Sequence, residues 1–297
     1  MRLGTHNVNG IRAALRRGAA DFWDGTDTDV IGLQEVRCRV EDLPEGAFGP
    51  YHVALAPGLL AGRNGVAVLT RVAPSRVRTL SGTVWQATPG GALAQAGAER
   101  ISNRDLAPFA DEGRYVEVDL ADAPVRVASV YVPKGASWPK EPGSRDKYER
   151  KLRFLRGFAR LLTASRREAA AAGREFVVVG DFNIAHTRQD LRNWRTNQNS
   201  EGFLPEERDW FSGVVGSRRL VDVVRHLEPD AEGPYSWWSW RGQSFSGDVG
   251  WRIDYHLASP RLARSAIGQH TAREASYEAR MSDHCPVLVD YDVARLG

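Results

Sequence analysis

Residues 176–183 read FVVVGDFN, a run of apolar and mostly β-branched residues that leads directly into Gly180, Asp181 and Asn183. Such a run is typical of a buried β-strand, and functional groups tend to lie where the chain leaves a rigid sheet. The rest of the chain repeats this pattern of a short apolar run followed by polar residues. Similar runs lie at 30–33, 66–69, 115–118, 125–132, 252–257 and 287–293.

Two helices are predicted between these strands. The stronger one covers 144–172, where apolar residues recur at three- and four-residue steps and arginines occupy the other face. A second helix should begin at Pro205, whose Pro-Glu-Glu sequence suits a first helical turn. The polar segment 81–112 is interpreted as a surface insertion between strands.

The order of these elements decides the fold class. Seven or more strands with few helices between them predict two packed sheets with helices outside, since a strictly alternating parallel sheet needs a helix between almost every pair. The 297 residues are 42% hydrophobic, which is enough for a large core, and they contain no linker or short repeat. We therefore expect one α/β domain over residues 1–297.

The sequence also limits the cellular location. It has no run of about 18 apolar residues and no basic-then-apolar segment at the start, so we expect neither membrane insertion nor secretion. Its two cysteines, Cys38 and Cys285, cannot form a disulfide framework or a zinc site unaided, and Cys285 is interpreted as an apolar filler. We expect a monomer in the cytoplasm.

Charge is unevenly distributed along the chain. Net charge is +3, but residues 134–174 alone carry twelve Lys or Arg against four Asp or Glu. Most of the cations are arginines, whose guanidinium forks suit phosphate. Because GC-rich coding also enriches arginine, this charge allows a polyanionic partner without requiring one.

Polar side chains recur at the ends of the apolar runs, so several strands could deliver them to one rim. They are mainly carboxylates and amides with one histidine, a set that suits Mg²⁺, or Mn²⁺ as the alternative, and argues against zinc and copper. These residues are Asn7, Asn9, Gln34, Glu35, Tyr131, Asp181, Asn183, Asp254, Asp283 and His284.

Seven short motifs in a fixed order resemble the exonuclease III family of AP endonucleases, within the endonuclease/exonuclease/phosphatase superfamily. The GWRIDY motif resembles the DNA-repair branch, whereas phosphoinositide phosphatases and sphingomyelinases share only the LQE-, GDFN- and SDH-like elements. The resemblance covers nearly the whole chain and implies a deoxyribonuclease I-like, four-layer sandwich of two mixed β-sheets flanked by helices. The motifs are THNVNG (5–10), IGLQE (31–35), YVP (131–133), GDFNIAH (180–186), GFLPEER (202–208), GWRIDY (250–255) and SDHCP (282–286).

The resemblance implies catalytic roles for five residues. Asp181 would orient or deprotonate the attacking water, Asn183 would donate to the phosphorane oxygen, and Tyr131 would reach the phosphate. His284 would be an imidazolium held by Asp254. Taken alone, Asp181 and Asn183 could equally form an Asx turn, His284 a structural histidine and Tyr131 part of the core.

Metal binding is centred on Glu35, which follows four mainly apolar residues where a turn would usually have Gly, Asn or Asp. We interpret Glu35 as a metal ligand. Whether one or two ions bind is left open. The candidate ligands are Asn7, Glu35, Asp181, Asn183, Asp283 and His284.

DNA contacts are implied by an aromatic segment near the C-terminus. In the family, an aromatic residue and a Trp-x-aliphatic pair line the pocket for a flipped-out abasic sugar, and Trp237, Trp251 and Ile253 match them. Trp238 and Trp240 are interpreted as core residues. Arg241 would enter the helix from its loop.

Three positions depart from the family pattern. His6 stands where Trp is common, and strand alternation turns it away from Asn7, so we expect only a packing change. Ser129 stands where Asn is frequent in the family, so the sequence does not decide whether Ser129 forms the hydrogen bonds of that Asn. Lys134 replaces an amide and either contacts DNA phosphate or is a solvated loop lysine.

We therefore expect a Mg²⁺-dependent DNA repair enzyme that cleaves double-stranded DNA 5′ to abasic sites and trims 3′ ends as a 3′–5′ exonuclease. One alternative is another superfamily enzyme, such as a ribonuclease or phosphoinositide phosphatase, which GWRIDY and the aromatic run before it argue against. The other is a DNA-binding protein with an inactive site, which the complete set of carboxylates argues against.

Overall fold

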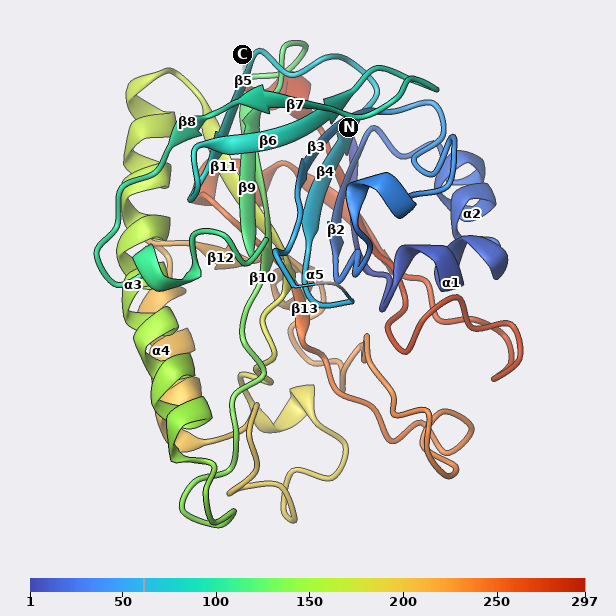
Figure 1. Ribbon diagram of the computed structural model, residues 1–297. Coiled ribbons are helices and arrows are strands. Elements are labelled where there is room, and N and C mark those ends of the chain that lie inside the picture. The colour runs from blue at the N-terminus through green and yellow to red at the C-terminus, as the bar shows by residue number, and fades with distance from the viewer. Residues whose placement is uncertain (61, 297) are drawn as a thin grey trace.

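The apolar runs form strands that pair into two mixed sheets in the computed structural model, which describes residues 1–60 and 62–296 (Figure 1). The eight-stranded sheet has the order β14 (Ala266–Thr271), β15 (Val287–Tyr291), β1 (Arg2–Asn7), β2 (Val30–Gln34), β4 (Val66–Thr70), β3 (His52–Ala56), β6 (Thr83–Ala87), β7 (Ala94–Gly97). The seven-stranded sheet has the order β12 (Val221–Asp222), β13 (Asp254–Ala258), β11 (Glu175–Asp181), β10 (Val125–Tyr131), β9 (Tyr115–Asp119), β5 (Arg76–Thr79), β8 (Glu99–Arg100).

Helices cover both outer faces, as Figure 1 shows, and complete four layers. The predicted helices are confirmed as α3 and α4, and both pack on the seven-stranded sheet. The short α1 and α2 pack on the other sheet. None of the helices in the described ranges is long and apolar enough to span a bilayer. The helices are α1 (Ile11–Arg16), α2 (Ala19–Gly25), α3 (Arg145–Ala171), α4 (Pro205–Val214), α5 (Val223–Leu227) and α6 (Pro260–Arg264), with 3₁₀ turns at Val40–Asp42, Ala107–Phe109, Arg188–Asp190 and Val293–Leu296.

The inner faces of the two sheets meet in an apolar layer rich in valine, to which Val68 and Val179 belong. A Cβ on Gly32 would lie 2.6 Å from Val179 Cγ2, so the sheets approach closely at this glycine. Beside it, Ser129 Oγ donates to the Leu33 carbonyl at 2.9 Å and Gln34 Nε2 donates to Ser129 Oγ at 3.0 Å. Ser129 therefore links the two sheets by hydrogen bonds where the family often has Asn.

Some sequence-based boundaries were wrong. The segment 81–112 is not an insertion, because β6 and β7 extend one sheet and β8 extends the other. Its alternation is obscured by small and polar residues at these sheet edges. The strand predicted at 252–257 begins only at Asp254, because the backbone N–H of Arg252 donates to the Asp190 carbonyl at 2.8 Å, outside the sheet. The Arg252 side chain pairs with Asp190 and Asp222. Cys38 and Cys285 are both free and buried, as expected.

His6 packs against α2, as predicted from strand alternation. Its ring is fully buried, Trp23 Nε1 donates to its Nδ1 at 3.2 Å, and its Nε2 has no hydrogen-bond partner within the described residues. Burial lowers the pKa of His6 to about 3. The folded protein therefore keeps this imidazole neutral at acidic pH.

A pH dependence of stability follows from His6. Between its folded pKa of about 3 and its ordinary value of 6.5, the unfolded chain binds a proton that the folded protein does not. The wild type should therefore lose about 1.4 kcal/mol of unfolding free energy per pH unit as the pH falls below 6.5. Compared with His6→Phe, it should lose about 2 kcal/mol more between pH 7 and pH 5 in urea denaturation. Equal losses of unfolding free energy in the wild type and in His6→Phe would mean that folded His6 is protonated. We expect His6→Phe to leave catalysis unchanged.

Candidate active site

The predicted functional residues converge because of strand direction. The parallel pairs β1–β2 and β10–β11 lie in the middle of the two sheets, and their carboxyl ends carry Asn7, Glu35, Tyr131 and Asp181. The antiparallel neighbours β13 and β15 begin at the same edge, so they bring in Asp254 and the segment before Val287. Segments far apart in sequence thus meet at one end of the sandwich.

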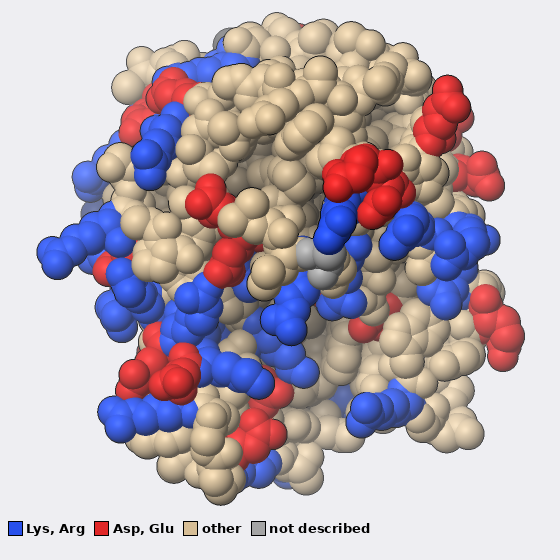
Figure 2. Space-filling view, viewed as in Figure 1, with Lys and Arg blue, Asp and Glu red and all other residues tan. Residues whose placement is uncertain are grey.

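A pocket of about 360 Å³ opens at this edge. Its lining residues come from the ends of the central strands and from loops 132–144, 186–203, 232–251 and 272–286. Figure 1 shows these loops extending from the lower end of the sandwich. On the face shown in Figure 2, Lys and Arg side chains gather across the middle of the view. The pocket is lined by Glu35, Arg37, Tyr131, Lys134, Asp181, Asn183, Asn197, Ser200, Glu201, Gly202, Trp237, Trp251, Ile253, Asp283 and His284.

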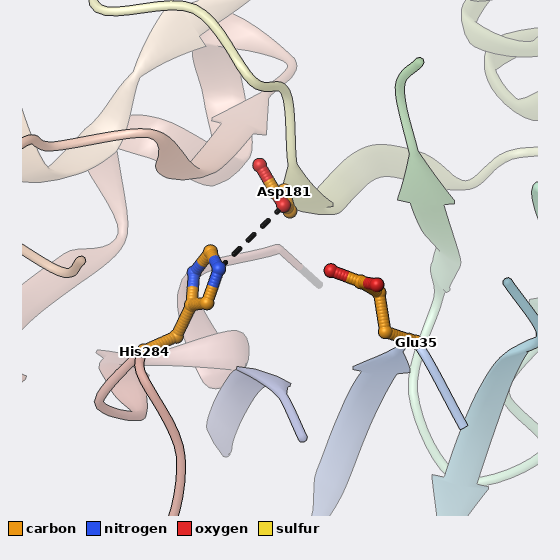
Figure 3. A group of neighbouring side chains, drawn as sticks. All are labelled: Glu35, Asp181 and His284. Carbon is orange, nitrogen blue, oxygen red and sulfur yellow. Dashed lines mark ion pairs between the residues drawn. The ribbon is translucent and has the colours of Figure 1, made fainter. Parts of the chain in front are cut away.

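Two carboxylates and an imidazole point toward one another in the pocket (Figure 3). Glu35, Asp181 and His284 each offer a ligand atom, and these atoms lie within 4.8 Å of one another. Asn7 Nδ2 donates to Glu35 Oε1 and to Asp181 Oδ2, both at 2.9 Å. Arg37 pairs with the other oxygen of Glu35.

The carboxyl group of Asp181 is in an unusual electrostatic environment. Burial raises its pKa to about 8; the nearby His284 opposes this rise, whereas Asp254 and Glu35 add to it. A carboxylate so close to another carboxylate needs a positive charge to stay ionised at neutral pH. This part of the pocket is therefore suited to a cation.

The His284 ring contacts a second carboxylate, that of Asp254, on the side away from the pocket. Its Nδ1 lies 2.8 Å from Asp254 Oδ2, which also accepts a hydrogen bond from Ser236 Oγ at 2.6 Å. Burial favours the neutral ring, but Asp254, together with Asp181 and Asp283, raises the pKa of His284 to about 10. Its Nε2 lies 3.8 Å from Asp181 Oδ2 and faces the pocket as part of an imidazolium.

Asn183 and Tyr131 complete the polar wall. Asn183 N donates to Asp181 Oδ1 at 2.7 Å, so the Asx turn considered from the sequence is present, and this turn brings Asn183 to the pocket. The Asn183 amide Nδ2 donates to the Val132 carbonyl at 2.9 Å. Burial, with Glu35 and Asp181 nearby, raises the pKa of Tyr131, so its hydroxyl is a neutral donor.

Three predicted site residues lie elsewhere or make other contacts. Asn7 lies beneath the pocket and orients two lining carboxylates. Asp254 also lies beneath the pocket, where it contacts His284 as expected. Asp283 lines it, but its oxygens accept hydrogen bonds from Asn9 Nδ2 and Trp237 Nε1, at 2.7 and 3.1 Å. Arg241 is exposed on a loop outside the pocket.

One wall of the pocket is aromatic. Trp237 and Trp251 lie edge to face with ring centroids 6.3 Å apart, and they pack with Ile253. Trp238 is core, as expected. The interpretation of Trp240 as core was wrong, because this residue is only half-buried in a loop and is covered by Arg280, whose guanidinium carbon is 4.1 Å from the ring centroid.

Sequence reasoning missed several lining or supporting residues. Arg37 follows Glu35 by two positions and could have been found as a cation beside the motif. Ser236 and Lys151 gave no local signal, since their partners lie 18 and 32 residues away in the chain. Lys134 is exposed, and its Nζ lies 3.7 Å from Glu201 Oε1 at the pocket rim.

A known family description, the Endonuclease/Exonuclease/phosphatase family, matches residues 4–284. The chain belongs to this family. An exodeoxyribonuclease of Bacillus subtilis is 30% identical over 97% of this chain and 98% of its own length. Recombination repair protein 1 of Drosophila melanogaster is 27% identical over 99% of this chain, which spans 37% of that protein.

The fold is also shared with solved structures. An AP endonuclease from Archaeoglobus fulgidus superposes with a TM-score of 0.78 at 24% identity, and the match covers 98% of this chain and 99% of that one. These relatives confirm the resemblance to the exonuclease III group and the four-layer fold. The chain is an enzyme of the DNA repair nuclease class.

Proposed function

We propose that this nuclease cleaves the DNA backbone 5′ to abasic sites in a Mg²⁺-dependent reaction and trims 3′ ends as an exonuclease. The observation that carries the proposal is the position of the Glu35–Asp181–His284 group beside an aromatic wall in one pocket. The Glu35–Asp181–His284 group suits phosphodiester cleavage. The aromatic wall suits recognition of a sugar that lacks its base.

The residues divide the chemistry between them. Asp181 is the general base that orients and deprotonates the attacking water; its raised pKa makes it a stronger base once a cation beside it keeps the carboxylate ionised. The His284 imidazolium donates a hydrogen bond to the phosphate and stabilises its developing negative charge. Tyr131 donates to another phosphate oxygen, and Asn183 Nδ2 would exchange its 3.2 Å hydrogen bond to Asp181 Oδ2 for one to the phosphate.

The donor set fits a hard divalent cation. Glu35 and the Asp181 carboxylate would hold it, because His284 is protonated and the Nδ2 group of Asn7 already faces both carboxylates. When bound, Mg²⁺ supplies charge neutralisation at the scissile phosphate. The close approach of two buried carboxylates supports this assignment, since the ion would relieve their repulsion.

Damage recognition is assigned to the aromatic wall. Trp237, Trp251 and Ile253 form a surface suited to a base-free deoxyribose, and a normal nucleotide would have to be unstacked at a cost of a few kcal/mol. Gly202 supports this wall closely, because a Cβ there would lie 3.1 Å from Trp251 Cζ3. Lys134 would contact the DNA backbone, and Arg241 would enter the helix from its exposed loop.

One assay tests the proposal. A labelled duplex with a single tetrahydrofuran abasic analogue is incubated with and without Mg²⁺, beside an undamaged duplex and a phosphoinositide. We expect Mg²⁺-dependent incision 5′ to the analogue and slower shortening of 3′ ends. Phosphate release from the phosphoinositide without incision of either duplex would contradict the proposal.

Two variants separate the aromatic wall from the exposed loop. Trp251→Ala should lower abasic incision about 100-fold, and undamaged DNA trimming much less, because a buried aromatic contact is worth about 3 kcal/mol. Arg241→Ala should mainly alter duplex binding and product release. Single-turnover rates of both variants on both duplexes measure this. If Trp251→Ala slows both substrates equally and lowers the melting temperature in parallel, Trp251 is a core residue only.

A further inference from the structure

Beneath the pocket lies a buried lysine that the reaction does not use directly. Lys151 is on α3, and its side chain is 2% exposed. Its Nζ donates to the Asn183 carbonyl at 2.8 Å and to the Lys134 carbonyl at 3.0 Å, and it pairs with Glu207 Oε1 at 2.7 Å. An ammonium has three hydrogens, so these three acceptors satisfy it completely.

The three acceptors belong to three segments around the pocket. Lys134 follows β10 and Asn183 follows β11, and both residues line the pocket. Glu207 lies in the first turn of α4, where its Oε2 accepts from Leu204 N at 3.0 Å. The segment before α4 contains Gly202, whose carbonyl accepts from Ala185 N at 2.8 Å. Lys151 therefore joins the loop after β10 and the loop after β11 to the start of α4.

The backbone of Asn183 lies in the left-handed region, with φ at +50°. Asparagine adopts this region more readily than most other non-glycine residues, and contacts such as the one from Lys151 help to maintain it here. Lys151 binds the carbonyl of this same residue. Gly202 leaves room for that carbonyl oxygen, because a Cβ there would lie 3.1 Å from it. The hydrogen bond from Lys151 Nζ thus holds the peptide group after Asn183.

We propose that Lys151 is a positioning residue that fixes the backbone of Asn183 and so aims its side-chain amide at the scissile phosphate; this inference rests on the role proposed for Asn183 in phosphodiester cleavage. Stability alone does not explain the lysine, because a buried ion pair is often no more stabilising than apolar residues of similar volume. What an apolar replacement cannot provide is the pair of hydrogen bonds to the two loop carbonyls.

The test must separate positioning from the cost of leaving one charge buried. The double variant Lys151→Met with Glu207→Gln removes both charges, keeps the length of the Glu207 side chain and shortens that of Lys151 by only its terminal atom. The amide oxygen that replaces the Glu207 carboxylate can still accept from Leu204 N. A matched control is Arg78→Met with Glu117→Gln, a second buried pair between β5 and β9 at 2.5 Å. Both double variants are compared with the wild type on the abasic duplex.

We expect the Lys151/Glu207 double variant to lower kcat about 10- to 100-fold, because a misplacement of about 1 Å can cost about 100-fold in rate. KM should change less than about 3-fold, since the contacts with the DNA remain. Deuterium exchange should become faster in peptides covering 181–185. The control pair should lower the melting temperature but leave kcat within about 3-fold of the wild type.

A thermodynamic cycle with Asn183→Ala completes the test. If Lys151 acts through Asn183, the double change should alter kcat less than about 3-fold in the Asn183→Ala background. Two results would overturn the assignment. One is that the Lys151/Glu207 double change lowers kcat as much in the Asn183→Ala protein as it does alone. The other is that this double change alone leaves both kcat and deuterium exchange as in the wild type. A wild type without activity on the abasic duplex would instead refute the proposed function, and the exchange measurement would still decide whether Lys151 orders residues 181–185.

Discussion

Replacing Glu35 with Gln should lower turnover on the abasic duplex about 1,000-fold or more while duplex binding largely persists. The side chain keeps its size and can still accept from Asn7, but it loses the charge that would hold Mg²⁺ beside Asp181. A metal ion contributes several kcal/mol to stabilising the transition state, and about 1.4 kcal/mol corresponds to a tenfold rate change. Single-turnover incision over a Mg²⁺ titration measures the loss.

A matched control is available in the same pocket. Glu201 also lines it, but it lies outside the three-residue group and pairs with the exposed Lys134. Glu201→Gln should therefore stay within about 3-fold of the wild type, since exposed ion pairs contribute little. Wild-type incision by Glu35→Gln at low Mg²⁺ would remove Glu35 from the metal site.

Much of this fold was predictable because each central strand is a short, contiguous run of apolar residues. A run such as 176–179 is apolar on both faces, since β11 lies between two apolar layers, and the polar residues after it mark where the strand ends. The convergence of Glu35, Asp181 and His284 followed from motif order and from strand direction. Edge strands such as β7 escaped detection because their exposed small residues have no periodic apolar signal.

The supporting contacts could not be predicted, because each joins residues distant in sequence. Ser236 bonds to Asp254 and Lys151 bonds to Asn183, and neither donor stands in a distinctive local pattern. Arg252 fits a strand pattern in the sequence, but in the structure it lies before β13 and forms buried ion pairs with Asp190 and Asp222. Such contacts depend on how layers pack, which single-sequence periodicity does not specify.

Removing either member of the His284–Asp254 pair should also have a large effect. His284→Asn loses the cation that faces the phosphate, and Asp254→Asn loses the carboxylate that keeps the imidazole protonated and oriented at 2.8 Å. Each single change should lower kcat about 100- to 1,000-fold, the usual loss when one donor to a developing oxyanion is removed. Both variants are measured on the abasic duplex at saturating Mg²⁺.

The double variant decides whether the two residues act as one unit. If Asp254 works only through His284, the combined loss should match that of His284→Asn, whereas independent roles would multiply to about 10,000-fold or more. His256→Asn is the control for losing a buried imidazole, because His256 lies on β13 and contacts the Val287 carbonyl at 3.1 Å, not the pocket. It should lower the melting temperature and leave kcat unchanged. Multiplicative losses in the pair would mean that Asp254 has a separate role, and that its electrostatic hold on His284 does not govern the reaction.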